Sequence, residues 1–302
     1  MLGALLLTTI TASVPLILAS LGGVISERSG VTNIGIEGMI LTSAFVAVLG
    51  SYYTGNPWIG AVSGVLAGGA LSLVHAFATI TCGGNQAVSA CAITLFATGI
   101  TSFGNRAVFK RAGLSDPVNA LSTSEIFRGI PRVGNLLADF SPYIYATLIL
   151  IIIICYVLNK TPVGLRITTV GENPRVAETV GVNVWRLRYI CVFISGCLAG
   201  LAGAYLSTGQ INTFQEGMSQ GRGYLALAAM LMGQWKPGRT TFMAVFFGLF
   251  YAISLQVQFV PALRIPPSLV QMLPFVACLV ATSLSKRTVG PAANGVPYLK
   301  RK

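Results

Sequence analysis

The sequence predicts an all-α, polytopic membrane protein, a single domain over residues 1–302 with about eight or nine transmembrane helices, some of them short or broken. Composition is the first reason. Hydrophobic residues make up 54% of the chain and charged residues only 9%, and the mean hydropathy is +0.74, whereas soluble domains carry roughly 25% charged residues. The second reason is that the apolar residues fall into stretches of about 20, the length that crosses a bilayer. We therefore expect lipid to surround this chain.

Seven stretches are long and apolar enough to span a membrane by themselves. They cover about 3–22, 58–80, 86–105, 141–159, 188–208, 240–258 and 267–285. Two further stretches, about 35–51 and 223–235, are short or interrupted by polar residues. The first stretch has no preceding Lys or Arg and no clear cleavage pattern, so we expect a retained span and not a signal peptide.

Glycines recur at helical spacing in two of these spans. They are Gly60, Gly64 and Gly68 in one span, and Gly196, Gly200 and Gly203 in the other. Small residues in lipid allow helix backbones to approach closely. The spacing therefore predicts that each of these two spans packs one face tightly against another helix.

The net charge of +12 raises the question of nucleic-acid binding. The basic residues lie in short loops and at the C-terminus, where the preference of Lys and Arg for the cytoplasmic side explains them better. We expect no nucleic-acid partner. The same rule places the loop of about 160–188 and the basic tail of 286–302 in the cytoplasm, and about 106–140 in a long external loop. If 223–235 did not cross, the tail would lie outside.

No motif for catalysis or metal binding stands out. The six cysteines form no C-x-x-C pair and lie in or beside apolar segments, so neither a metal site nor a disulfide framework is predicted. Residues 233–240 (GQWKPGRT) nearly match a phosphate-binding loop, but Arg239 replaces the lysine and no strand precedes it. We expect no catalytic residue, no metal ligand and no cofactor bound by this chain.

A basic, polar island separates two apolar segments at residues 160–188 (KTPVGLRITTVGENPRVAETVGVNVWRLR). Asn173 is a good N-cap, Pro174 suits the first helical position, and Gly181 supplies a left-handed stop. A helix of about two turns is too short to be stable alone. The pattern indicates a docking loop for a soluble subunit, with a solvated interhelical loop as the alternative.

Glu37 is an ionisable residue expected at membrane depth, where such groups are costly and usually face a partner or a water-filled path. Glycines and Asn33 surround it, which suggests a broken helix whose freed backbone groups line a cavity. The alternatives are that Glu37 lies in the interface and pairs with Arg28, or that it is protonated and hydrogen-bonds to a neighbouring helix.

Amide and hydroxyl groups gather at two further places. Asn85, Gln86 and Ser89 lie on one helical face, and Gln210 opens a polar stretch that ends near residue 222. Amides suit an uncharged, hydroxyl-rich ligand because they donate and accept, although they also join helices to one another. A path entrance or a solvated loop would explain the second group. The predicted substrate path comprises Asn33, Glu37, Asn85, Gln86, Ser89 and Gln210, while His75 is expected to be a buried, hydrogen-bonded histidine.

Four segments resemble a known family. They are 27–39 (ERSGVTNIGIEGM), 84–102 (GNQAVSACAITLFATGITS), 170–205 (VGENPRVAETVGVNVWRLRYICVFISGCLAGLAGAY) and 217–234 (GMSQGRGYLALAAMLMGQ). They cover about a third of the chain, which resembles permease subunits of bacterial ABC importers of the branched-chain amino acid/ribose group. The most similar members are nucleoside and simple-sugar permeases paired with a second permease and a basic-membrane-protein type lipoprotein. Where that family often has a further Asn, this chain reads AIT at 92–94.

The resemblance implies a function. It implies that 171–180 is a coupling helix seated on a cytoplasmic ABC ATPase, and that the chain forms half of a path for a nucleoside, a related ribose-containing solute or a simple sugar. The implied partners are this ATPase, a second permease subunit and an external lipoprotein, in a bacterial cell membrane, and the ATP is used by the ATPase. The implied coupling residues are Gly171, Glu172, Asn173, Pro174, Arg175 and Glu178.

An ion-coupled secondary transporter is the alternative function, with Glu37 as the titrating group on a broken helix. Uptake that persists without ATP and collapses with the proton gradient would favour it.

Overall fold

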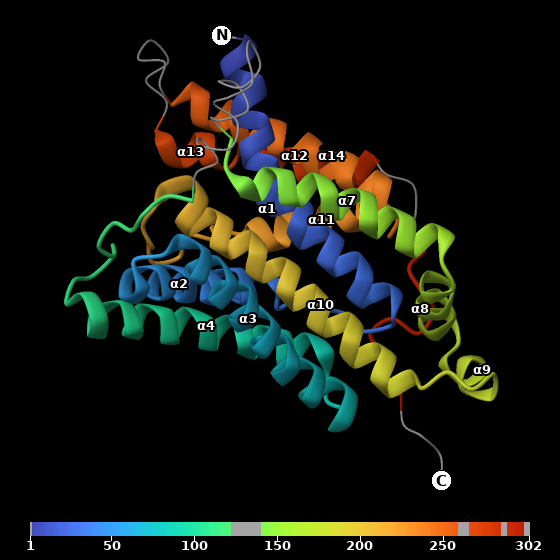
Figure 1. The fold of residues 1–302 in the computed structure, drawn as a ribbon. Helices are drawn as coiled ribbons and strands as arrows, with labels where there is room; N and C mark the ends of the chain where they lie inside the picture. The colour runs from blue at the N-terminus through green and yellow to red at the C-terminus, as the bar shows by residue number, and fades with distance from the viewer. Residues whose placement is uncertain (1, 122–139, 259–265, 285–288, 299–302) are drawn as a thin grey trace, which may run out of the picture.

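The computed structural model describes residues 2–121, 140–258, 266–284 and 289–298, and within these ranges the secondary structure is helical (Figure 1). Seven helices there are long and apolar enough to cross a membrane. They are α1 (Leu2–Arg28), α2 (Ile36–Thr54), α3 (Pro57–Ala76, continued by a π-helical turn, Phe77–Thr81), α4 (Gln86–Phe109), α7 (Pro142–Lys160), α10 (Val184–Ala204, continued by the π-helical Tyr205–Ile211) and α12 (Pro237–Val257). The prediction of an all-α polytopic protein is confirmed.

Shorter helices complete the described fold. They are α8 (Pro162–Glu172), α9 (Pro174–Thr179), α11 (Arg222–Met232), α13 (Pro267–Gln271) and α14 (Leu273–Leu284). The stretch 35–51, expected to be short, is a full-length helix, whereas 223–235 contains a helix of only 11 residues. The stretch 267–285 is divided at Met272 instead of forming one continuous span. Pro274 explains the division, because its ring clashes with the carbonyl four residues earlier in a continuous helix.

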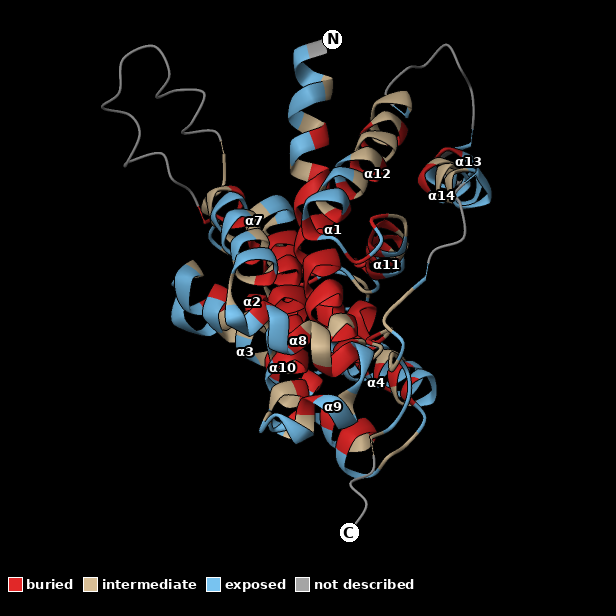
Figure 2. Cartoon of the chain, turned by 90° about the vertical axis from the view of Figure 1, so that its right-hand side faces the viewer, coloured by how far each residue is buried: buried red, intermediate tan, exposed pale blue. Residues whose placement is uncertain are grey.

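The core lies along α1, α2 and α10, where buried residues are concentrated (Figure 2). α1 packs against α10, α11 and α12. The helix α1 is apolar on all sides, and Leu18, Ala19 and Leu21 in its middle are fully buried within the described structure. A helix of this kind is typical of the centre of a membrane bundle.

The two glycine series form a close seam among α2, α3 and α10. A methyl group on Gly68 would lie 2.4 Å from the carbonyl oxygen of Gly196, and one on Gly200 would lie 2.9 Å from that of Gly64. Where α10 meets α2, a methyl group on Gly203 would lie 2.2 Å from the carbonyl oxygen of Ile40. The predicted close packing is confirmed, and the two glycine series face each other across the contact between α3 and α10.

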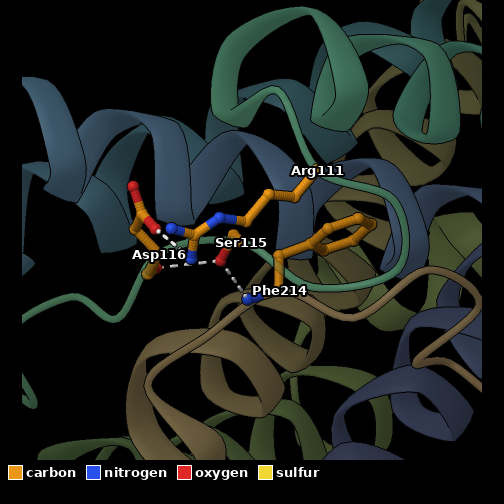
Figure 3. A network of polar contacts seen from close by, with 4 residues as sticks. All are labelled: Arg111, Ser115, Asp116 and Phe214. Carbon is orange, nitrogen blue, oxygen red and sulfur yellow. Dashed lines mark hydrogen bonds and ion pairs between the residues drawn. The ribbon is translucent and has the colours of Figure 1, made fainter.

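The loop predicted at 106–140 is folded onto the bundle where it is described. The N–H of Ser115 donates to the carbonyl of Phe214 at 2.9 Å, and its hydroxyl accepts from the Phe214 N–H at 2.8 Å (Figure 3). The Phe214 ring is fully buried against Phe45, with ring centroids 5.1 Å apart. Nearby, a hydrogen bond from the Gly113 N–H and the charge of Arg106 lower the pKa of Glu216. Residues 122–139 of the loop lie outside the described residues.

Candidate coupling surface and transport path

The short helix predicted in the polar island is α9. The Asn173 side chain accepts from the Val176 N–H at 3.3 Å, Pro174 begins the helix, and Gly181 follows it with φ +83°. These three predictions are confirmed. The helix has only 6 residues, Pro174–Thr179, and the preceding Gly171 and Glu172 belong to the end of α8 instead. The chain turns sharply at Asn173, so 171–180 is not one helix.

α9 stands apart from the main bundle beyond α8 (Figure 1). Two exposed side chains there are apolar, since Val176 on α9 is 50% exposed and Val180, directly after the helix, is 71% exposed, with Arg175 exposed beside them. Ala177 is buried on the inner face, in a small cluster with Val170. Val176, Val180 and Arg175 are therefore side chains that another molecule could contact.

Gly171 plays a different part from the exposed residues of this region. It is buried, and a methyl group at this position would lie 2.0 Å from the carbonyl oxygen of Arg28. Gly171 therefore allows α8 to cross the end of α1. Any contribution to coupling would come through this packing and not through contact with a partner.

Glu37 binds the beginning of α11. Its carboxylate oxygens accept from the N–H groups of Gly221 at 2.8 Å and Gly223 at 2.7 Å, and the residue is 6% exposed. Free N–H groups and a partial positive charge at a helix N-terminus both favour a carboxylate. The contact to a neighbouring helix is observed, but Glu37 accepts both hydrogen bonds there and does not donate as a protonated carboxyl would. Glu37 thereby fastens the first turn of α2 to the first turn of α11.

The connection between α1 and α2, residues 29–35, is held by side chains from several helices. The Thr32 N–H donates to the side-chain oxygen of Gln86 at 2.6 Å. The His75 ring lies between the Thr32 carbonyl and the Ser89 hydroxyl, 3.0 Å from each. The prediction of a buried, hydrogen-bonded His75 is confirmed. Backbone groups freed by the break are thus satisfied by α3 and α4, and such a buried network favours one arrangement.

Two further predicted path residues are also hydrogen-bonded. Asn33 is fully buried and donates to the Ser195 hydroxyl on α10 at 3.1 Å. Asn85 is exposed and caps α4, since its side-chain oxygen accepts from the N–H of Ala87 at 2.9 Å and of Val88 at 3.1 Å. In this structure both side chains stabilise the fold. Contact of either with a solute stays a prediction.

A cavity of about 370 Å³ with a mixed polar and apolar lining lies between the end of α10, the beginning of α11, α12 and the α13–α14 pair. Its lining comprises Gln210, Ile211, Gln220, Arg222, Tyr251, Ser254, Leu255, Gln271 and Phe275. The Arg222 guanidinium stacks over the Tyr251 ring at 4.6 Å and also donates to its hydroxyl, which donates to Gln220 at 3.1 Å. Among the described residues, the lining offers amide donors and acceptors and the Arg222 guanidinium, and it contains no carboxylate. It suits a neutral solute with hydroxyl and carbonyl groups and disfavours a cation.

Residues 5–282 match the protein family described as the branched-chain amino acid transport system/permease component. The chain belongs to this family. It is 37% identical to the guanosine ABC transporter permease protein NupQ of Bacillus subtilis, over 97% of this chain and 96% of that protein. It is 32% identical to the nucleoside ABC transporter permease protein NupC of Lactococcus lactis, over 96% and 95%. It is also 23% identical to the glucose ABC transporter permease protein TsgB13 of Haloferax volcanii, over 86% and 71%.

The permease is therefore a multi-pass protein of the cell membrane. Sequence reasoning found Gln210, Gln220 and Arg222 within one polar stretch but missed Tyr251 and Gln271, which also line the cavity. Gln271 had a recognisable signal, because it is an amide inside an otherwise apolar stretch. Tyr251 had none, since one tyrosine among the aromatic residues of α12 is unremarkable until the fold places it beside Arg222.

Proposed function

We propose that this permease forms half of the translocation path of an ATP-driven importer of nucleosides and is driven by a separate ATPase that docks on α9. The observation that carries the proposal is the pair of exposed apolar side chains outside the bundle, Val176 on α9 and Val180 directly after it. The named functions of NupQ and NupC support a nucleoside, and TsgB13 makes a sugar the second candidate solute.

The proposed mechanism is alternating access. ATP binding closes two ATPase subunits, and their motion displaces α9 and the adjoining α8. Because Gly171 in α8 packs directly on the end of α1, a displacement of α8 would be felt in the helix at the centre of the bundle. A second permease subunit would supply the other half of the path, and an external lipoprotein would deliver the solute.

We propose that the solute contacts the cavity between α10, α12 and α13–α14, through Gln210 together with Gln220 and Gln271. The other predicted path residues are Asn33, Glu37, Asn85, Gln86 and Ser89. Each is engaged in hydrogen bonds here, so each would have to give up a hydrogen bond to bind a solute instead.

The coupling assignment predicts the effect of a charge on α9. In the complete transporter reconstituted in vesicles with its binding protein, Val176→Asp should reduce the amount of ATPase that stays bound to the permease by about tenfold or more. It should reduce ATP-dependent guanosine uptake to a similar extent. The reason is that burying an unpaired carboxylate against a partner is strongly unfavourable. Val176→Ile, which keeps the face apolar, is the control and should transport normally. Full uptake by Val176→Asp would contradict docking on α9, and uptake driven by a proton gradient without ATP would favour the secondary transporter.

The solute assignment predicts a separate effect in the cavity. Gln271→Leu removes the donor and acceptor while keeping a similar volume, so the maximal rate of guanosine uptake should fall about fivefold, as expected for the loss of one hydrogen bond. ATP hydrolysis stimulated by the empty binding protein should not change. Gln256→Leu, on α12 but outside the cavity lining, is the matched control. Equal effects of the two variants would contradict the assignment, and the same assay with ribose or glucose tests the sugar alternative.

A further inference from the structure

The C-terminal segment 289–298, here called the C-terminal strap, lies across the end of the bundle that carries α9. It was predicted as part of a basic tail, but the five basic residues of 286–302 lie outside the described residues. The described part is composed mainly of small and apolar residues. In Figure 1 it is drawn in red beside α8 and the beginning of α10. Its contacts reach both the membrane helices and α9.

One part of the strap is bound to the end of α1 and to the α1–α2 connection. The Asn294 amide donates to the Glu27 carboxylate at 3.1 Å and accepts from the Thr32 hydroxyl at 3.1 Å. The same Glu27 oxygen accepts from the Trp235 indole at 2.7 Å, just beyond α11. Gly290 packs on the Trp235 ring, since a methyl group there would lie 2.8 Å from it. Thr32 is thus hydrogen-bonded to Asn294 through its hydroxyl, and to Gln86 and His75 through its backbone N–H and carbonyl.

The rest of the strap is bound to α8 and α9. The Ala293 N–H donates to the Gly171 carbonyl at 2.8 Å, and the Ala292 N–H donates to the Glu172 carboxylate at 3.3 Å. The Tyr298 hydroxyl donates to the Glu178 carboxylate, which raises the pKa of Tyr298. The Tyr298 ring also packs on the cluster around Ala177. The strap is therefore bound to the end of α8 through the backbone N–H groups of Ala292 and Ala293, and to α9 through the side chain of Tyr298.

A buried arginine fixes the strap to the same connection a second time. Arg188 is 1% exposed, near the beginning of α10. Its Nη1 donates to the Val296 carbonyl at 3.3 Å and its Nε donates to the Ser29 carbonyl at 3.0 Å. The strap and the α1–α2 connection therefore share one side chain, and a displacement of either would be opposed by the other.

We propose that the C-terminal strap transmits the displacement of α9 to the end of α1 and the α1–α2 connection, with Asn294 and Tyr298 as positioning residues; this rests on the proposed ATPase coupling. A groove of about 550 Å³ runs between residues 172–175 and residues 292, 293 and 296–298 of the strap. The strap thus lies on the same exposed face as α9, and the partner that docks on α9 would contact both. Residues 289–298 would in this way take part in coupling.

The test is the number of solute molecules taken up per ATP hydrolysed by the complete transporter in vesicles. For Asn294→Ala, and for Tyr298→Phe, we expect this ratio to fall on the order of tenfold, within the range typical of coupling between two sites. In both variants the ATPase should still co-purify with the permease, and the rate of ATP hydrolysis should stay near that of the wild type. Deletion of 289–302 should uncouple further, and the two point variants test the proposal even if the deletion fails to assemble.

Val289→Ala is the control, because Val289 belongs to the strap but is 86% exposed. It should leave the ratio unchanged. A wild-type ratio in both point variants would overturn the proposal, as would equal losses of uptake and hydrolysis, since these would indicate a fold defect and not uncoupling. Failure of the proposed function is distinguishable from these outcomes, because the wild-type transporter itself would then show no uptake that depends on ATP.

Discussion

Replacing Gly68 by leucine is expected to prevent normal assembly of the bundle. A methyl group alone would lie 2.4 Å from the Gly196 carbonyl oxygen and 2.8 Å from the Gly200 Cα, so α3 and α10 would have to separate. Adding side-chain volume to a packed core usually costs 1–3 kcal/mol when neighbouring side chains can move. Here the opposing atoms are backbone, so we expect a loss of about 3 kcal/mol or more, at the upper end of that range.

Thermal unfolding of the purified permease in detergent measures this effect, together with the yield of monodisperse protein. Gly99→Leu is the matched control, because Gly99 is exposed on α4 and a methyl group there meets nothing within 4 Å. That variant should unfold at the wild-type temperature. If the two variants unfolded at the same temperature, the close seam between α3 and α10 would not be a determinant of stability.

The glycine seam and the caps of α9 could be predicted because their signals are local. A glycine every fourth residue marks one helix face whatever that face packs against, and Asn173, Pro174 and Gly181 act within a few residues of themselves. The identity of the partner face was not predictable from either series alone. Pro274 is a local signal of the same kind, and it could have indicated the division between α13 and α14.

The partner of Glu37 and the binding of the strap could not be predicted, because both depend on tertiary contacts to backbone groups. The Glu37 carboxylate accepts from N–H groups 184 and 186 residues away. The strap is bound partly through the Ala292 and Ala293 N–H groups, and every non-proline residue has such a group, so composition carries no signal. The sequence suggested polar contacts for Glu37 correctly but left three alternatives open.

Glu37→Ala is expected to destabilise the permease by loosening α11. It would leave the Gly221 and Gly223 N–H groups without their acceptor in a buried site, which costs about 1–3 kcal/mol for each group. It would also remove a negative charge from a helix N-terminus, worth up to about 1 kcal/mol at an exposed site and more in a partly buried one. Since water reaching the gap would satisfy part of this loss, we expect about 2–5 kcal/mol in total.

Hydrogen exchange of the α11 amides and thermal unfolding in detergent measure that loss. Glu37→Gln is the informative comparison, because its oxygen can still accept from one N–H group while its NH2 group faces the other. Its stability should therefore lie between those of the wild type and Glu37→Ala, with uptake reduced in step with stability. A Glu37→Gln variant with wild-type stability and no uptake would show instead that the carboxylate acts in transport itself and not only by holding α11. The structure favours the first outcome, since both oxygens of the carboxylate already accept from backbone N–H groups.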